Sequence, residues 1–210
     1  MESNISLDLS DPDLRDFLLA ALAVEVFMVL FFGECKVYDL STAMFTAFLL
    51  GWMARGKILL YHAVFPLACF NRETACFLIV VFAMYGLRRL TVTSWIQSVG
   101  YQALAFLGIR VFLLLQFNSL AGGLFWFRPT ENLQMYIDAP LQGAIYLTGM
   151  AAVVLLCIRR WARQPALLQT AFIIMVPCLV TLYLFVGYTF EIRVFAEIYP
   201  VIVAMIFRRL

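Results

Sequence analysis

The chain has 210 residues, of which 64% are hydrophobic and 13% charged, and its formal net charge is +2. A soluble domain has about 25% charged residues, so this composition excludes a water-soluble particle. The low net charge, without any basic block, also excludes a nucleic-acid partner. We therefore expect an all-α, polytopic transmembrane helical bundle surrounded by membrane lipid.

The first 16 residues, 1–16, are predicted to be an acidic cytoplasmic lead-in. A secretory signal would begin with basic residues, so the first apolar segment is expected to remain as a span. Residues 17–210 are expected to form one transmembrane helical domain.

Polar residues divide this domain into about eight apolar segments, each predicted to be a membrane helix. The segments are 17–33, 40–54, 58–70, 75–87, 92–117, 139–158, 166–188 and 194–207. The third and fourth are short and meet at the polar tip Asn71-Arg72-Glu73. Residues 58–87 are therefore either two short tilted spans, which we favour, or a re-entrant hairpin that leaves about six crossings. The longest polar stretch inside the domain, 128–138 between the fifth and sixth segments, is predicted to be a linker.

Basic residues in the loops predict the orientation of the chain. With the N- and C-termini cytoplasmic, most basic residues fall inside, as the positive-inside rule requires. The inner set is Arg15, Arg55, Lys57, Arg88, Arg89, Arg159, Arg160, Arg163, Arg208 and Arg209, and the outer set is Lys36, Arg72, Arg128 and Arg193.

Two charged residues fall inside predicted spans. Glu25 lies near the middle of the first span, where a carboxylate is costly unless it pairs, protonates or faces a polar cavity. It is either a proton-relay or ligand group, or an interhelical contact. Arg110 lies near the outer end of the fifth span, so it either pairs with outer acidic residues or binds a lipid phosphate.

The densest polar feature at membrane depth is Glu191-Ile192-Arg193, followed by Glu197, where the seventh segment turns into the eighth. Arg193 is a candidate for bidentate phosphate binding, and Glu191 for the base that acts on the bound group. Glu197 is a further candidate for the binding site. The alternative is a structural lock that ties the last two spans to the outer loops.

The stretch Glu191 to Pro200, EIRVFAEIYP, resembles a C-terminal signature of uncharacterised bacterial multispan proteins linked to surface polysaccharide assembly. Some of these are similar to lipid-linked glycosyltransferases of the GT-C type. The resemblance implies a bacterial inner (plasma) membrane and a catalytic acid in the first outer loop, a region where Glu34 and Asp39 lie. The chain has none of the long outer loops of such enzymes, which favours an accessory role.

Cysteine and histidine usage indicates no metal site and no cofactor. His62 is the single histidine, and the five cysteines form no CxxC pair. Whether Cys35, Cys69 and Cys76 form disulfides is left open.

Three functions remain after these exclusions. We favour a non-catalytic subunit or accessory protein of a membrane complex, with a protein partner or a second copy of itself. The alternatives are an outer-leaflet enzyme acting on lipid-linked glycan or phosphate, and a small transporter or channel with Glu25 and Arg110 on its pathway.

Overall fold

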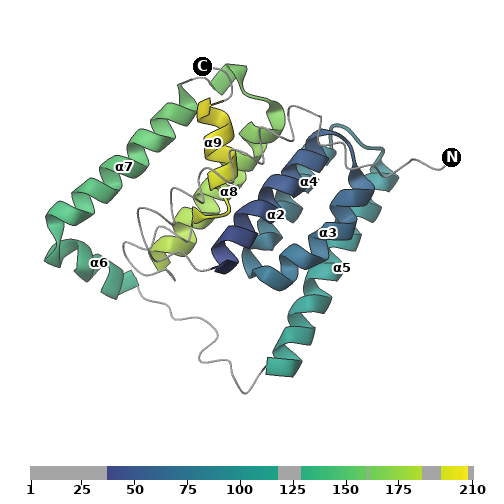
Figure 1. Cartoon of the computed structure of the whole chain (residues 1–210), viewed down its shortest axis with the longest axis horizontal. Coiled ribbons are helices and arrows are strands. Elements are labelled where there is room, and N and C mark those ends of the chain that lie inside the picture. Colours follow the sequence, from purple (N-terminus) through teal and green to yellow (C-terminus); the bar gives the residue numbers. More distant parts are fainter. Residues whose placement is uncertain (1–36, 118–128, 160, 186–194, 208–210) are drawn as a thin grey trace.

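The computed structural model describes residues 37–117, 129–159, 161–185 and 195–207, which are drawn as a coloured ribbon in Figure 1. These residues are largely helical and include no β-strand, which confirms the all-α prediction. The α-helices are α2 (Val37–Ala54), α3 (Ile58–Asn71), α4 (Cys76–Gly86), α5 (Val92–Phe117), α6 (Pro129–Asp138), α7 (Pro140–Ile158), α8 (Ala166–Phe185) and α9 (Tyr199–Phe207). Two 3₁₀ turns, η1 (Glu73–Ala75) and η2 (Trp161–Arg163), lie between them.

Every predicted apolar segment in the described part of the chain contains a helix. The segment 17–33 and the lead-in 1–16 lie outside the described residues. Three helices, α5, α7 and α8, are long and apolar enough to cross a membrane. Their length and composition indicate a membrane protein.

The turn between α2 and α3 is closed by backbone hydrogen bonds around Gly56. The Lys57 N–H donates to the Trp52 carbonyl at 2.9 Å, and the Gly56 N–H donates to the Met53 carbonyl at 3.2 Å. This pair of bonds is the Schellman motif, which needs a left-handed residue after the helix. Gly56 supplies it with φ of 69°, at no steric cost because glycine has no Cβ.

Helix α4 lies at the centre of the bundle. It packs against α5 on one side and α8 on the other, while α2 packs against α3 and α9. The connections α2–α3, α4–α5 and α7–α8 lie at one end, which we call the basic end (Figure 1). The α3–α4 tip, α6 and the start of α9 lie at the opposite end, which we call the tip end.

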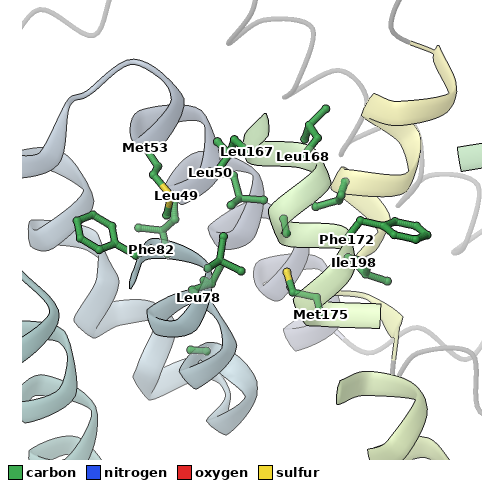
Figure 2. Packing of buried hydrophobic residues seen from close by; sticks show 14 of the residues in the cluster. Leu49, Leu50, Met53, Leu78, Phe82, Leu167, Leu168, Phe172, Met175 and Ile198 are labelled. Carbon is green, nitrogen blue, oxygen red and sulfur yellow. The ribbon is translucent and has the colours of Figure 1, made fainter. Parts of the chain in front are cut away.

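The best-buried side chains join α2, α4, α8 and the residues just before α9, as Figure 2 shows. Leu50, Val81 and Leu179 have no exposed surface, and Ile198 is 1% exposed. Lipid tails are as apolar as these side chains, so association of the helices depends on van der Waals packing rather than on the hydrophobic effect. This packing holds α4 between its neighbours and fixes the position of the hairpin tip.

The stretch predicted as a linker, 128–138, is instead mostly helical, because residues 129–138 form α6. Pro129 occupies the first helical position, where its missing N–H costs nothing. Leu133 and Ile137 are four residues apart, and so are Asn132 and Tyr136, which is helical spacing. The polar composition of the stretch hid this periodicity.

Helix α6 packs against α7 because Gly143 lacks a side chain. A Cβ added at Gly143 would lie 2.5 Å from Cδ1 of Tyr136, closer than any real contact. The same addition at Gly149 of α7 would meet nothing within 4 Å. The two glycines therefore form a matched pair for testing how α6 is held.

We expect Gly143→Ala to displace the Tyr136 ring and lower stability by about 1–3 kcal/mol, the usual cost of overpacking. Gly149→Ala should leave stability unchanged or slightly raised, since alanine is the better helix former. Thermal unfolding of the two purified variants in detergent measures this difference. Equal unfolding midpoints would show that Tyr136 does not need the space at Gly143.

Candidate functional site

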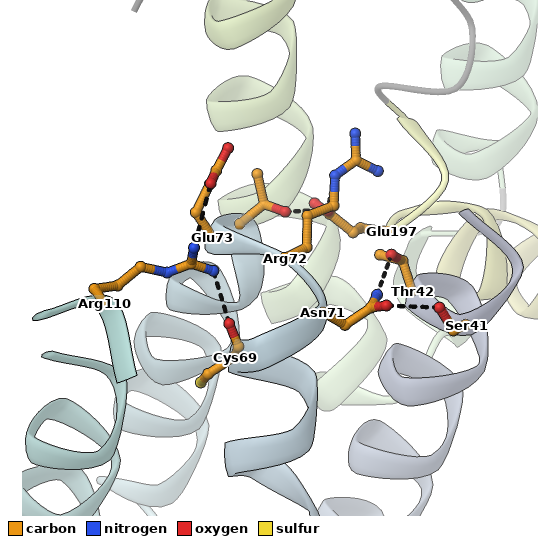
Figure 3. A network of polar contacts seen from close by, with 9 residues as sticks. Ser41, Thr42, Cys69, Asn71, Arg72, Glu73, Arg110 and Glu197 are labelled. Carbon is orange, nitrogen blue, oxygen red and sulfur yellow. Dashed lines mark hydrogen bonds and ion pairs between the residues drawn. The ribbon is translucent and has the colours of Figure 1, made fainter. Parts of the chain in front are cut away.

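The hairpin tip between α3 and α4 is the most polar place in the described part of the bundle. Asn71 ends α3, and Arg72 then takes an extended conformation with φ −154° and ψ 145°, which stops the helix. Polar side chains from α2, from α5 and from the turn just before α9 surround this hairpin tip (Figure 3). We call this group the tip cluster; it consists of Ser41, Thr42, Asn71, Arg72, Glu73, Thr74, Arg110 and Glu197.

Glu197 is the most deeply buried charged residue of the tip cluster. Its side chain is 4% exposed, and its Oε1 lies 3.4 Å from Nε of Arg72. The Thr74 hydroxyl donates a hydrogen bond to the same oxygen. A buried carboxylate is costly unless it is paired and hydrogen-bonded, so Arg72 and Thr74 stabilise its charge. The pair ties the turn just before α9 to the α3–α4 tip.

Arg110 reaches the tip from α5. Its Nη2 donates to the Cys69 carbonyl at 2.7 Å, and its Nη1 lies 3.4 Å from Oε2 of Glu73. The Cys69 carbonyl belongs to the last turn of α3, where a helix has no N–H of its own to offer. Arg110 therefore caps α3 from a neighbouring helix, which is a favourable place for a cation.

The ion pair between Arg110 and Glu73 contributes less than this cap. The Glu73 side chain is 69% exposed, so water screens its charge. Nε of Arg110 is buried and has no hydrogen-bond partner among the described residues.

Asn71 joins the end of α3 to the first turns of α2. The Ser41 hydroxyl donates to Oδ1 of Asn71 at 2.7 Å, and Nδ2 of Asn71 donates to the Thr42 hydroxyl at 2.6 Å. The oxygen and the nitrogen of the Asn71 amide therefore both form hydrogen bonds between α3 and α2.

A small cavity lies beside these contacts, lined by polar residues such as Thr42, Asn71 and Glu197 and by apolar ones such as Phe45 and Met175. The centre of a water molecule can occupy a volume of about 10 Å³ inside it, which is enough for one water. The cavity is the size of one buried water and far smaller than a sugar or a lipid headgroup.

A second polar contact lies deeper in the bundle and joins α3, α4 and α5. The Tyr61 hydroxyl lies 3.2 Å from Oε1 of Gln102 and 3.3 Å from the Leu78 carbonyl. Gln102 is fully buried, and its Nε2 has no hydrogen-bond partner within the described ranges. His62 lies beside this group, packed against the rings of Phe82 and Tyr101.

Comparisons of the chain with protein-family models, with curated proteins and with solved structures gave no match. What the tip cluster does must therefore be inferred from its contacts and charges.

The structure brings two of the candidate residues, Arg110 and Glu197, to the tip end, where each has a different partner. The backbone of Asp39 lies in the first turn of α2, at the same end. The remaining candidates lie outside the described residues; they are Glu25, Glu34, Glu191 and Arg193. Cys69 and Cys76 are free thiols, and Cys35 also lies outside the described residues.

Several residues of the tip cluster were not predicted as site residues. Asn71 and Arg72 were recognised only as a polar tip, and the hydroxyls of Ser41 and Thr42 gave no signal at all. The sequence contained one indication of the tip cluster. This was a polar turn between two apolar segments, each of which is short for a lipid-exposed span. Gln102 had a clearer signal, because it is the glutamine nearest the middle of the long apolar helix α5, where an amide requires a partner.

We expect Arg72→Ala to destabilise the protein by about 3 kcal/mol, because it leaves the buried Glu197 carboxylate without its guanidinium. The double variant Arg72→Ala with Glu197→Gln should be less destabilised, since it removes both charges while keeping an acceptor for Thr74. Arg88→Ala, at an exposed arginine of the basic end, is the control. Unfolding midpoints in detergent measure all three, and a midpoint for Arg72→Ala equal to that of Arg88→Ala would contradict the role given to the pair.

Proposed function

We propose that this chain is a non-catalytic subunit or accessory protein of a membrane complex, and that α7 binds a membrane helix of the partner. The outward face of α7 carries this proposal. Ala144, Thr148 and Ala152 follow one another at intervals of four residues, and all three are exposed. Small residues at this spacing let another transmembrane helix approach closely enough for van der Waals contact.

The contrast with α5 supports a protein partner at α7. Both helices are candidate spans with few buried residues. The outward side chains of α5 are mostly large, among them Leu104, Leu107 and Leu115, whereas α7 has a row of small residues beside large exposed ones such as Leu147 and Leu155. Large aliphatic side chains suit contact with lipid tails, whereas a face of small residues offers lipid little contact and favours a close-packed helix.

The contacts of the tip cluster count against a lipid-linked enzyme that uses Arg110 and Glu197 to bind its substrate. Glu197 is buried against Arg72 and Thr74, and Arg110 caps the end of α3. Either group would have to leave these structural contacts before it could act on a substrate.

We further propose that the basic end faces the cytoplasm and the tip end faces outward. The described residues of the basic end include Arg55, Lys57, Arg88, Arg89 and Arg159, whereas the described acidic side chains Glu73, Glu131, Asp138 and Glu197 lie at the tip end. The positive-inside rule supports this orientation.

The position of Arg110 along α5 supports a hairpin 58–87 that crosses the membrane. It contacts the tip eighteen residues beyond Val92, or about 27 Å at 1.5 Å per residue, close to the thickness of the hydrocarbon core. In this proposal the chain crosses about eight times with both termini cytoplasmic.

The orientation predicts which engineered thiols a membrane-impermeant maleimide reaches. In a background without the native cysteines, Gln134→Cys at the tip end should label in intact cells. Arg88→Cys at the basic end should label only after the membrane is permeabilised. The reverse pattern would place the basic end outside.

The partner-binding face predicts an effect on co-purification. Ala144→Leu combined with Ala152→Leu should reduce the partner recovered in gentle detergent, or convert a homo-oligomer to monomer, because the larger side chains hold the helices apart. Ala63→Leu, at an exposed alanine of α3, is the matched control and should change nothing. A chain that purifies alone as a monomer, or equal recovery from both variants, would overturn the proposal.

A further inference from the structure

Helix α6 presents three chemically different sides. Successive residues of an α-helix are about 100° apart around its axis, so residues four apart share a side. Asn132 and Tyr136 define the first side, and Leu133 and Ile137 the second. The third side carries the polar residues Glu131, Gln134 and Asp138.

The first side contacts protein. Nδ2 of Asn132 donates to the Leu184 carbonyl of α8 at 3.0 Å, and Asn132 is 5% exposed. The hydroxyls of Tyr136 and Tyr183 share a hydrogen bond of 3.1 Å. With the Tyr136 ring over Gly143, these contacts hold α6 against α7 and α8 and fix its rotation about its own axis.

The second side is apolar and is not covered by the described part of the chain. Leu133 and Ile137 are each 63% exposed. Two apolar residues in the first turns of α7, Leu141 and Ile145, are also exposed, by 76% and 64%. One residue, Ala139, separates the two helices, so this apolar surface adjoins the outward surface of a candidate span.

The direction of α6 is set by the sharp turn at Ala139. In Figure 1, α6 turns away from the axis of α7 and runs back beneath the tip end of α8. If α7 crosses the membrane, α6 therefore runs along the membrane surface rather than through it. The third side, with two carboxylates and an amide, then faces water, where charged groups keep their hydration.

We propose that α6 is an interfacial helix, lying in the plane of the membrane with Leu133 and Ile137 inserted at the boundary between phospholipid headgroups and acyl chains. Amphipathic helices of this kind bury their apolar side about 5–10 Å into that boundary. Its two carboxylates make an anionic lipid surface unfavourable, so the ligand that fits is a zwitterionic phospholipid. The helix would set the depth and tilt of α7 in the bilayer.

Photo-crosslinking of the full chain in phosphatidylcholine vesicles tests this placement. The photoreactive residue p-benzoylphenylalanine is introduced at Leu133, at Ile137 or, as control, at Gln134 on the water-facing side. We expect several times more lipid adduct, measured by intact mass, at the first two positions than at the third. Equal lipid adduct at all three positions, or adduct at Leu133 and Ile137 to a second copy of the chain, would overturn the proposal.

Fluorescence quenching gives an independent measurement, and tryptophan is a smaller substitution than p-benzoylphenylalanine. The emission that Leu133→Trp adds to that of the four native tryptophans, obtained by subtracting the signal of the unsubstituted chain, should be quenched by lipids brominated high on the acyl chain. This quenching should be stronger than that of the emission added by Gln134→Trp. Quenching of the two variants to the same extent would place Leu133 outside the membrane. Neither result depends on whether α7 binds a partner, so the two proposals fail separately.

Discussion

The burial of one carboxylate, Glu197, constrains much of the tip end. A charge with a side chain 4% exposed is stable only beside an opposite charge and a hydrogen-bond donor, and Arg72 and Thr74 supply these from the hairpin tip. The start of α9 must therefore dock on the α3–α4 turn. Arg110 then fixes the same turn from α5 by capping α3. In this way the last helix of the chain is tied to a hairpin more than a hundred residues earlier.

The apolar helices by themselves would specify this arrangement weakly. A leucine side chain is as stable against lipid tails as against another helix. Packing of the core in Figure 2 therefore favours contact between helices without strongly selecting one register. Buried polar contacts are more selective, because a misplaced partner leaves a donor or acceptor unpaired in a medium of low polarity. The contacts of Glu197 join segments distant in the sequence, the contact of Gln102 joins α5 to α3, and those of Asn71 join the consecutive helices α2 and α3. We infer that these contacts select this packing.

The two flanking spans show how an outward surface can differ in chemistry while remaining apolar. Helix α5 presents mostly large side chains, and α7 presents the small residues Ala144, Thr148 and Ala152 beside large ones. The first surface suits contact with lipid, and the row of small residues on the second suits the close approach of another helix that we propose. Helix α6 adds a third kind of surface where α7 begins, with apolar and polar sides next to each other.

The sequence by itself determined the helical class and the places where most helices begin and end, because apolar runs and polar punctuation are local properties of the chain. It also indicated a polar tip at Asn71 to Glu73. It missed α6, whose helical spacing is hidden by polar residues that face water, and it could not pair Arg72 with Glu197 or Arg110 with the Cys69 carbonyl. Those pairings were decided by the tertiary structure alone, because they depend on which helix ends meet after packing, and no local pattern in the chain encodes that.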